Sequence, residues 1–365
     1  MSSEVAAKRP TQETATRKGN LEGIQYLRGY AAVAVVIAHA YGFAATPKYY
    51  GDFSIGAAQL ASGVHGVDLF FVISGFIVAY ITLNRESLTP RLSALDFFQR
   101  RFVRIVPIMW IAILSFWALR SFVASDGDWF DYLRALTLWP SGGVAPPQIW
   151  TLRHELIFYL FFGLFVLAFP RGRWLLVVVA VGPLPLQLVT PPEWIGTILN
   201  LVNLQFALGA LAALIYLRGP PVAAKFVIKR LGHVIVLALF VVMLLVSVSL
   251  EPFGNVTVVL GLGGMSVMIL WLATMIDGDG SRGATVARLL GDASYSIYLF
   301  HLHFIQVLLV LAPQYAPMAT PHLVVPAAAL IAALGGILLH LVVERPLLNW
   351  LQTTRPTGSR RAADS

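Results

Sequence analysis

The sequence predicts an all-α integral membrane protein: a single bundle of about ten transmembrane helices with both termini in the cytoplasm. Composition is the first observation behind this prediction, since 58% of the 365 residues are hydrophobic and only 12% are charged. Soluble domains are about half apolar and about a quarter charged, so this balance excludes an ordinary soluble fold and disorder over most of the chain. The second observation is a series of apolar stretches, because about 20 apolar residues in a helix cross a bilayer.

Ten such stretches follow one another along the chain. In order, they cover residues 24–44, 64–83, 105–123, 156–169, 174–189, 195–217, 233–250, 256–276, 295–312 and 323–343. The fourth and fifth are separated only by residues 170–173, which predicts a tight helical hairpin. The first residues lack the apolar core of a signal peptide. We therefore expect a cytosolic polar tail (residues 1–20), a ten-helix membrane domain (residues 21–350) and a cytosolic basic tail (residues 351–365).

The basic residues indicate how the bundle is oriented. With the N-terminus in the cytoplasm and alternating spans, only four of the 26 lysines and arginines fall outside, namely Lys48, Arg120, Arg134 and Arg153. This excess of basic residues on the cytoplasmic side is the positive-inside pattern. It also explains the net charge of +8 without a nucleic-acid partner.

The first span carries Arg28 and His39, which are residue types that a membrane helix normally excludes. They are 11 positions apart, so at 100° per residue they share one face of a helix, about 16 Å from each other. In the predicted orientation Arg28 lies at the cytoplasmic mouth and His39 lies in the outer half. The alternative is an arginine that snorkels to the membrane surface and a histidine bonded to a neighbouring helix.

Arg101 and Arg104 form a second group, next to the predicted start of the third span. Residues three apart share a helix face, and guanidinium groups are planar forks of donors that suit phosphate groups. The alternative is an ordinary basic collar at the inner edge of a span.

A third group precedes the fourth span, at its predicted outer end, where Glu155 directly follows His154. A carboxylate near an imidazole can orient the ring or share a proton with it. The alternative is a helix start with Thr151 as its N-cap. Asp68 is expected either to line an outer cavity or to sit at the membrane interface. His301 lies near mid-membrane, where it either faces the bundle interior or is a bonded core histidine.

Several kinds of chemistry are excluded. The chain has no cysteine, so it has no disulfides, iron–sulfur clusters or cysteine nucleophile. His301 and His303 point to nearly opposite sides of a helix and cannot hold one metal ion together. We therefore expect no metal site.

The motifs occur in an order that resembles a known family. They are Arg28-x10-His39, Gly66-Val67-Asp68-Leu69-Phe70-Phe71-Val72-Ile73-Ser74-Gly75-Phe76, Arg101-x2-Arg104, Ile149-Trp150-Thr151-Leu152 with Glu155 and Tyr159, and Asp292-Ala293-Ser294-Tyr295-Ser296-Ile297-Tyr298. Over about residues 24–346 the chain resembles the acyltransferase-3 family of integral membrane acyltransferases, most of all the branch that O-acetylates bacterial exopolysaccharides. One departure is His154, where relatives often carry a small residue followed by an acid.

The resemblance implies transfer of an acetyl group from cytosolic acetyl-CoA, or of another acyl group from its CoA ester, to a hydroxyl of a cell-surface or exported saccharide. It implies no permanently bound cofactor, a place in the bacterial inner membrane, and a saccharide or lipid-linked saccharide as acceptor. Membrane lipid and polysaccharide-assembly proteins are the other expected partners. Arg28, Arg101 and Arg104 would hold the CoA phosphates, and a pantetheine arm of roughly 15–20 Å matches the helix rise to His39.

His39 fits two chemistries, as a general base for the acceptor hydroxyl or as a nucleophile that carries the acyl group. In both, Glu155 would stabilise the imidazolium, and the Tyr159 and Ser74 hydroxyls would donate to the oxyanion. The side chains expected to contact substrate are Asp68, Ser74, His154, Tyr159 and His301.

Two other functions fit a polar membrane bundle. One is a transporter or flippase for a lipid-linked saccharide, which intramembrane arginine and histidine also suit. The sequence shows no internal repeat, whereas many transporters have one. The other is an accessory subunit of a polysaccharide synthase, which leaves the aligned Arg28 and His39 without a purpose.

Overall fold

The computed structural model describes residues 22–51, 62–123, 128–169, 174–219, 225–248, 255–276, 282–316 and 318–353. Within these ranges the chain is helical and contains no β-strand, only an isolated bridge between Leu83 and Pro90. The predicted all-α class is therefore confirmed. The predicted N-terminal tail, the turn at residues 170–173 and the end of the C-terminal tail lie outside the described residues.

The helices differ widely in length. In chain order they are α2 (Glu22–Ala44), α4 (Gly66–Thr82), α5 (Ala94–Val123), α6 (Trp129–Thr137), α7 (Trp150–Phe162), α8 (Leu175–Val181), α9 (Pro183–Leu186), α10 (Glu193–Ile198), α11 (Val202–Arg218), α12 (Lys225–Ser247), α13 (Val256–Ala273), α14 (Arg282–Asp292), α15 (Ser294–Tyr315), α16 (Pro321–Leu339) and α17 (Arg345–Thr353). Short 3-10 turns precede α4 and α7, at Ser62–His65 and Pro147–Ile149. π-helical turns follow α7 and α16, at Gly163–Ala168 and His340–Glu344.

Eight helices in the described ranges are long and apolar enough to cross a membrane. Two shorter apolar segments lie where the fifth and seventh spans are predicted: Val177–Leu186, which covers most of α8 and all of α9, and Val234–Ser247 within α12. The fifth is broken between α8 and α9 because Pro183 and Pro185 lack the amide N–H that continues a helix. The exact number of ten spans therefore stays a prediction, while the chain itself is a multi-pass membrane protein.

Two helices that carry predicted site residues begin earlier than the apolar stretches suggest. α5 begins at Ala94 because Ser93 caps it: the Ser93 hydroxyl accepts from the Asp96 amide at 3.1 Å and donates to the Asp96 carboxylate at 2.7 Å. α7 begins at Trp150. The charged and polar residues at these helix starts therefore project from regular helix rather than from loops.

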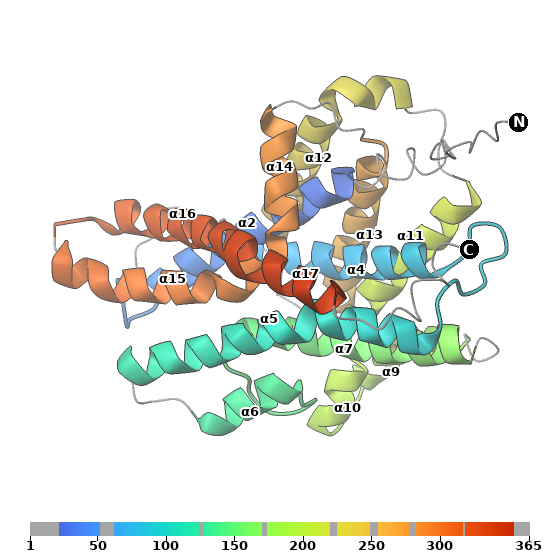
Figure 1. Cartoon of the computed structure of the whole chain (residues 1–365), viewed down its shortest axis with the longest axis horizontal. Helices are drawn as coiled ribbons and strands as arrows, with labels where there is room; N and C mark the ends of the chain where they lie inside the picture. Colours follow the sequence, from blue (N-terminus) through green and yellow to red (C-terminus); the bar gives the residue numbers. More distant parts are fainter. Residues whose placement is uncertain are drawn as a thin grey trace, which may run out of the picture.

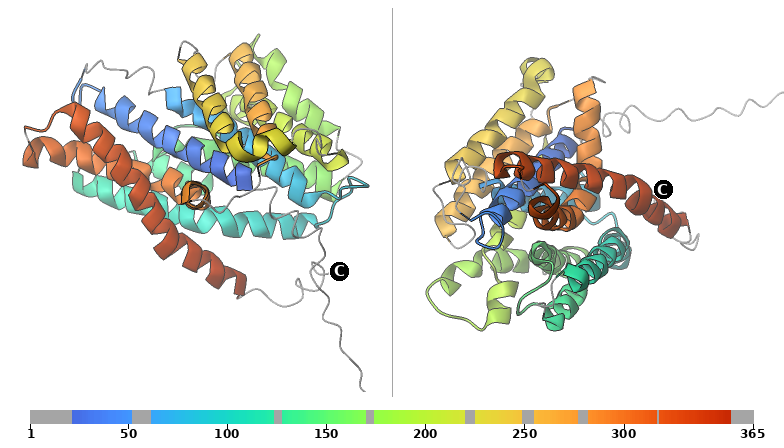
Figure 2. Two further views of the ribbon diagram at one scale, coloured as in Figure 1. Left: turned by 90° about the horizontal axis from the view of Figure 1, so that it is seen from above. Right: turned by 90° about the vertical axis from the view of Figure 1, so that its left-hand side faces the viewer.

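α2 lies at the centre of the bundle and packs against α4, α14, α15 and α16. α4 runs along α11, and α15 runs along α16. In Figure 1, α5 and α7 lie below α4, with α6 and α10 beyond them, while α12 and α14 lie on the opposite side. The right view of Figure 2 shows the same order, with the teal α5 at the bottom and the yellow α12 at the top. The first halves of α2 and α5 thereby come together with α4, α7 and the start of α15.

The outer faces of the bundle carry large apolar side chains. Trp117 in α5 is 51% exposed and Leu338 in α16 is 61% exposed. In water such faces would promote association, whereas lipid covers them without cost. The exposed apolar surface therefore agrees with a membrane protein.

Two glycines bring α4 and α11 into backbone contact. A Cβ added at Gly75 would lie 2.0 Å from the carbonyl oxygen of Phe206, and one added at Gly209 would lie 2.0 Å from that of Val72. Small residues permit such close approach between membrane helices. This contact fixes the position of Ser74, the residue before Gly75.

We expect Gly75→Ala to destabilise the protein by about 1–3 kcal/mol, because the added methyl group forces α4 away from α11. The measurement is thermal unfolding of the detergent-solubilised protein. Gly264→Ala on α13 is the control, since a Cβ there meets no atom within 4 Å. An equal or higher melting temperature for Gly75→Ala would show that the two helices are not in such close contact.

Candidate active site

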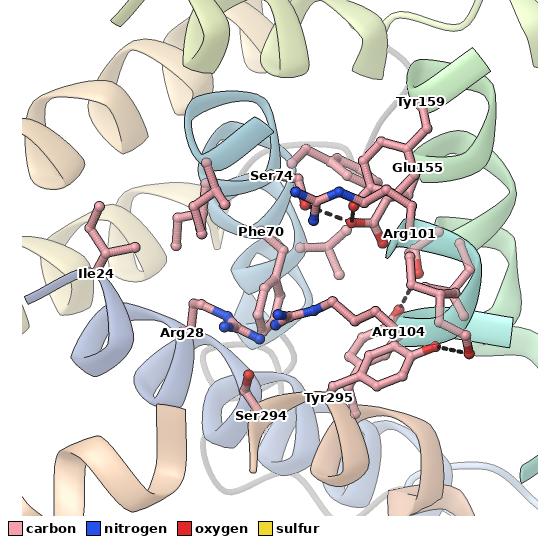
Figure 3. A pocket seen from close by; sticks show the side chains of 18 of the residues that line it. Ile24, Arg28, Phe70, Ser74, Arg101, Arg104, Glu155, Tyr159, Ser294 and Tyr295 are labelled. Atoms are coloured by element: carbon pink, nitrogen blue, oxygen red, sulfur yellow. Dashed lines mark hydrogen bonds between the residues drawn. The ribbon is translucent and has the colours of Figure 1, made fainter. Parts of the chain in front are cut away.

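Side chains from α2, α4, α5, α7 and α15 surround a pocket of about 230 Å³, shown in Figure 3. It brings together predicted site residues that are far apart in the sequence. The polar and charged residues that line it include Arg28, Ser74, Arg101, Arg104, Glu155, Tyr159, Ser294, Tyr295 and Tyr298. α2, α5 and α15 contribute residues from their first halves, whereas α4 contributes residues along most of its length.

Three arginines give this pocket an excess of positive charge. In Figure 3 the guanidinium groups of Arg28 and Arg104 approach each other from opposite walls. Glu155 is the one carboxylate among the residues that line the pocket. Within the described part of the chain, none of the ion pairs involves Arg28, Arg101 or Arg104. Because like charges repel, this arrangement favours an anion, and guanidinium groups bind phosphate with several hydrogen bonds.

Neutral groups hold two of these arginines in place. Arg28 donates from Nη1 to Gln25 Oε1 at 3.0 Å. The Arg101 guanidinium lies over two aromatic rings, 5.6 Å from the centre of Phe97 and 5.3 Å from that of Tyr159. Such cation–π contacts orient a guanidinium without neutralising it. The arginines are thus positioned but keep their charge for a ligand.

Glu155 lies inside this pocket rather than beside His39. Its Oε1 accepts hydrogen bonds from the Ser74 hydroxyl, at 2.7 Å, and from the Tyr159 hydroxyl. Glu155 therefore does not contact the imidazole that we expected it to stabilise. Both hydroxyls are committed to the carboxylate, so in this state they do not point a free proton at an oxyanion.

Thr151 takes a different place from the one that the helix-start interpretation gives it. α7 has no side-chain cap, so the N-cap interpretation of Thr151 is wrong. Its hydroxyl instead donates to the Gln148 carbonyl at 3.0 Å and lies 2.8 Å from the Tyr298 hydroxyl. The start of α7 is thereby tied to α15 at one wall of the pocket.

His39 is half-buried and faces α15. Its Nδ1 lies 3.0 Å from the Val35 carbonyl oxygen and 3.2 Å from Nε2 of His301. His301 is fully buried, and its Nδ1 lies 2.6 Å from the Tyr298 carbonyl oxygen. Both ring nitrogens of His301 therefore have protein partners, so the ring supports His39 instead of presenting a free nitrogen to substrate.

Tyr298 joins the pocket to the histidine pair. Its ring lines the pocket and lies 5.9 Å from that of Phe70, and also 5.9 Å from that of His301. His39 itself is not among the residues that line this pocket. Contacts between described residues therefore run from the pocket through Tyr298 and His301 to His39.

Two predicted substrate contacts lie elsewhere. Asp68 is buried, accepts from the Gln205 amide and pairs with His65 at 2.8 Å, so it neither lines this pocket nor sits at an interface. His154 is also buried, with its ring 5.5 Å from that of Trp150, and its Nδ1 has no hydrogen-bond partner in the part of the chain that the structure describes. Neighbouring positions on α7 face different sides, which separates His154 from Glu155.

Ser294 and Tyr295, like Tyr298, line the pocket but were not singled out from the sequence. The Tyr295 hydroxyl donates to the Ile105 carbonyl at 2.9 Å and so links α15 to α5. The Ser294 hydroxyl is buried beside Arg28 and Arg104, and none of the described residues forms a hydrogen bond with it. The only signal for them was the Asp292–Tyr298 motif, which marks a region but not which side chains face inward.

Known proteins resemble this chain over most of its length. Residues 21–341 match a family described as an acyltransferase domain. The chain belongs to the acyltransferase-3 family. It is 32% identical to the exopolysaccharide production protein ExoZ of Rhizobium meliloti, over 88% of this chain and 99% of ExoZ. It is 26% identical to the acyltransferase MdmB of Streptomyces mycarofaciens, over 93% of this chain and 94% of MdmB.

A third relative matches only in part. The O-acetyltransferase OatA of Staphylococcus aureus is 25% identical over 40% of this chain, which is 24% of OatA. No solved structure matches the chain. Family membership makes this protein an acyl-transferring enzyme, and it decides against the transporter and the accessory subunit.

Proposed function

We propose that this acyltransferase moves an acetyl group from cytosolic acetyl-CoA to a hydroxyl of an exported or cell-surface saccharide, in the inner membrane of a bacterium. The observation that carries the proposal is the convergence of Arg28, Arg101 and Arg104 near one end of α2, whose other half carries His39. None of the three has an ion-pair partner among the described residues. CoA has several phosphates at one end of a long arm and a thioester at the other. The spacing along α2 fits that shape.

The three arginines bind the phosphates, and the pantetheine arm extends past Tyr298 and Phe70 toward His39. Eleven residues of helix span about 16 Å, which is close to the length of that arm. Glu155 lies at the arginine end, where the Ser74 and Tyr159 hydroxyls donate to its carboxylate, so it acts there as a positioning residue and takes no part in the proton transfer at His39. This division places charge recognition at one end of the site and proton transfer at the other.

At the reactive end, Nε2 of His39 takes the proton from the acceptor hydroxyl while the oxygen attacks the thioester carbonyl carbon. The tetrahedral intermediate then collapses, the carbon–sulfur bond breaks, and the imidazolium returns the proton to the departing thiolate. The products are the acetyl ester and free CoA. Both substrates must be bound together in this scheme.

His39 is alternatively the nucleophile. Nε2 then attacks the thioester itself, CoA leaves as thiolate, and the acyl-imidazolium passes the acyl group to the hydroxyl, whose proton is lost in that second step. This scheme permits CoA release before the acceptor binds. Release of one equivalent of CoA without acceptor would favour it over the general-base scheme.

The direct test is acetyl transfer by the purified protein in lipid bilayers. We expect radiolabel from acetyl-CoA to enter saccharide as an alkali-labile ester, with release of CoA. Comparison of surface polysaccharide from a deletion strain, with ester signals resolved by NMR, identifies the acceptor in cells. If the purified protein neither consumes acetyl-CoA nor acetylates saccharide, the proposed donor or acceptor is wrong.

A further inference from the structure

We infer that His301 is a positioning residue, which accepts a hydrogen bond from Nδ1 of His39 and so presents Nε2 of His39 as the reactive nitrogen. The inference deepens the proposed function and rests on it where it concerns catalysis. It begins from the two rings, whose centres lie 4.9 Å apart with planes tilted by 45°.

Backbone carbonyls decide where the protons lie. A carbonyl oxygen only accepts, so Nδ1 of His301, 2.6 Å from the Tyr298 oxygen, must carry a hydrogen. For the same reason Nδ1 of His39, 3.0 Å from the Val35 oxygen, must carry one. In a neutral imidazole the other nitrogen is then an acceptor. If the protons were on the two Nε2 atoms instead, the carbonyl oxygens of Val35 and Tyr298 would face the lone pairs of the Nδ1 atoms and repel them.

The contact between the rings therefore has a direction. Nδ1–H of His39 is shared between the Val35 oxygen and Nε2 of His301, which lies 3.2 Å away. Nε2 of His39 keeps its lone pair, and no described residue forms a hydrogen bond to it. This is the nitrogen that the proposed reaction needs without a proton.

His301 is itself held rigidly. It is fully buried, so water does not compete for its nitrogens. The adjoining turn of α15 is braced by Gln148, whose amide donates to the Leu299 carbonyl at 2.8 Å, and by the Tyr298 hydroxyl, which donates to the Gln148 carbonyl at 3.1 Å. The position of His301 is therefore coupled to the wall of the arginine pocket.

The pair resembles the orienting half of a catalytic triad without its carboxylate. In a triad, a third residue holds the histidine in one tautomer and stabilises its charged form. Among the described residues no carboxylate bonds to His39 or His301, so a neutral imidazole fills this position. When Nε2 of His39 takes up a proton, its Nδ1–H becomes a stronger donor, and Nε2 of His301 accepts from it.

Nitrogen NMR of histidine-labelled protein in bilayers tests the hydrogen-bond assignment without any substrate. His39→Gln and His301→Gln identify which signals belong to each ring. We expect both rings to carry a proton on Nδ1 and none on Nε2 at neutral pH. A protonated Nε2 on either ring would overturn the inference, whether or not the protein transfers acetyl groups.

Kinetics test the catalytic part. We expect His301→Phe to lower kcat by about 10- to 100-fold, at or below the lower end of the roughly 100- to 10,000-fold that the acid or base itself contributes, and to leave KM for acetyl-CoA within about twofold. His301→Gln should restore most of the loss, because its amide oxygen supplies an acceptor. This rescue separates positioning from mere filling of space, and it remains informative if the Phe variant does not fold.

His303→Phe is the matched control. His303 lies on the same helix, but its Nε2 faces the Ser115 hydroxyl at 3.0 Å and the Ala112 carbonyl at 3.1 Å. We expect its kcat to stay within about twofold of wild type. Equal losses in His301→Phe and His303→Phe, or an unchanged kcat in His301→Phe, would overturn the positioning role. If the wild-type protein has no transferase activity, the proposed function is wrong. The nitrogen NMR spectrum then still tests where the protons lie on the His39 and His301 rings.

Discussion

His39→Ala is expected to lower acetyl transfer by about 100- to 10,000-fold, the range that general acid–base catalysis contributes. The reason is the geometry of the ring: Nδ1 is engaged by Val35 and His301, and Nε2 alone is left to handle the acceptor proton. Binding of acetyl-CoA should change little, because the arginines lie at the other end of α2. The measurement is ester formation by purified protein, with donor affinity determined separately.

The matched control is His322→Ala, which removes an exposed histidine near the start of α16. It should behave as wild type. Normal acetylation by His39→Ala, at wild-type expression, would remove this residue from the mechanism whatever the arginines bind.

Replacing Arg101 and Arg104 together with alanine is expected to weaken acetyl-CoA binding by about 100-fold or more. Hydrogen bonds to charged groups contribute about 1.5–3 kcal/mol each, and every 1.4 kcal/mol is tenfold in affinity. Neither guanidinium has a carboxylate partner among the described residues, so their charge is available to phosphate. Isothermal titration in detergent or nanodiscs measures the effect.

Arg100→Ala provides a close control, because Arg100 is exposed on the same turn of α5 and does not line the pocket. Its affinity for acetyl-CoA should stay within about twofold of wild type. Salt should weaken binding to wild type more than to the double variant, since screening acts on the charges that the variant lacks. Unchanged affinity in the double variant would contradict phosphate binding by these residues.

Much of the fold follows from local properties of the chain. Apolar stretches of membrane length predict the helices because a lipid interior requires backbone groups to bond within their own segment. The predicted helix ends are wrong where prolines or a helix cap, rather than hydropathy, decide where a helix begins or ends. Pro183 and Pro185 break one apolar stretch, and the cap at Ser93 starts α5 within a charged segment that hydropathy excludes.

For the candidate site, too, the sequence predicts some features correctly and others incorrectly. Arg101 and Arg104 line one pocket with Arg28. This agrees with their spacing on one helix face and with the expectation that all three arginines hold the same ligand. The interpretation of His39 as a histidine bonded to a neighbouring helix is confirmed, since its Nδ1 contacts His301 on α15. Its Nε2 has no hydrogen-bond partner among the described residues and is therefore available for proton transfer. Glu155 was expected beside His39 because both were predicted to lie toward the outer side, and the start of α7 places it instead against Ser74.

The sequence alone determined that this chain is a membrane helix bundle and that Arg28 and His39 share a face of one helix, because helical rotation is a local property. Only the tertiary structure decided that Glu155 meets Ser74 across 81 positions and that His39 meets His301 across 262. Such pairings depend on which helices approach closely, as α4 and α11 do at Gly75. In lipid that choice is made by shape and by interhelical hydrogen bonds, which no apolar stretch records by itself.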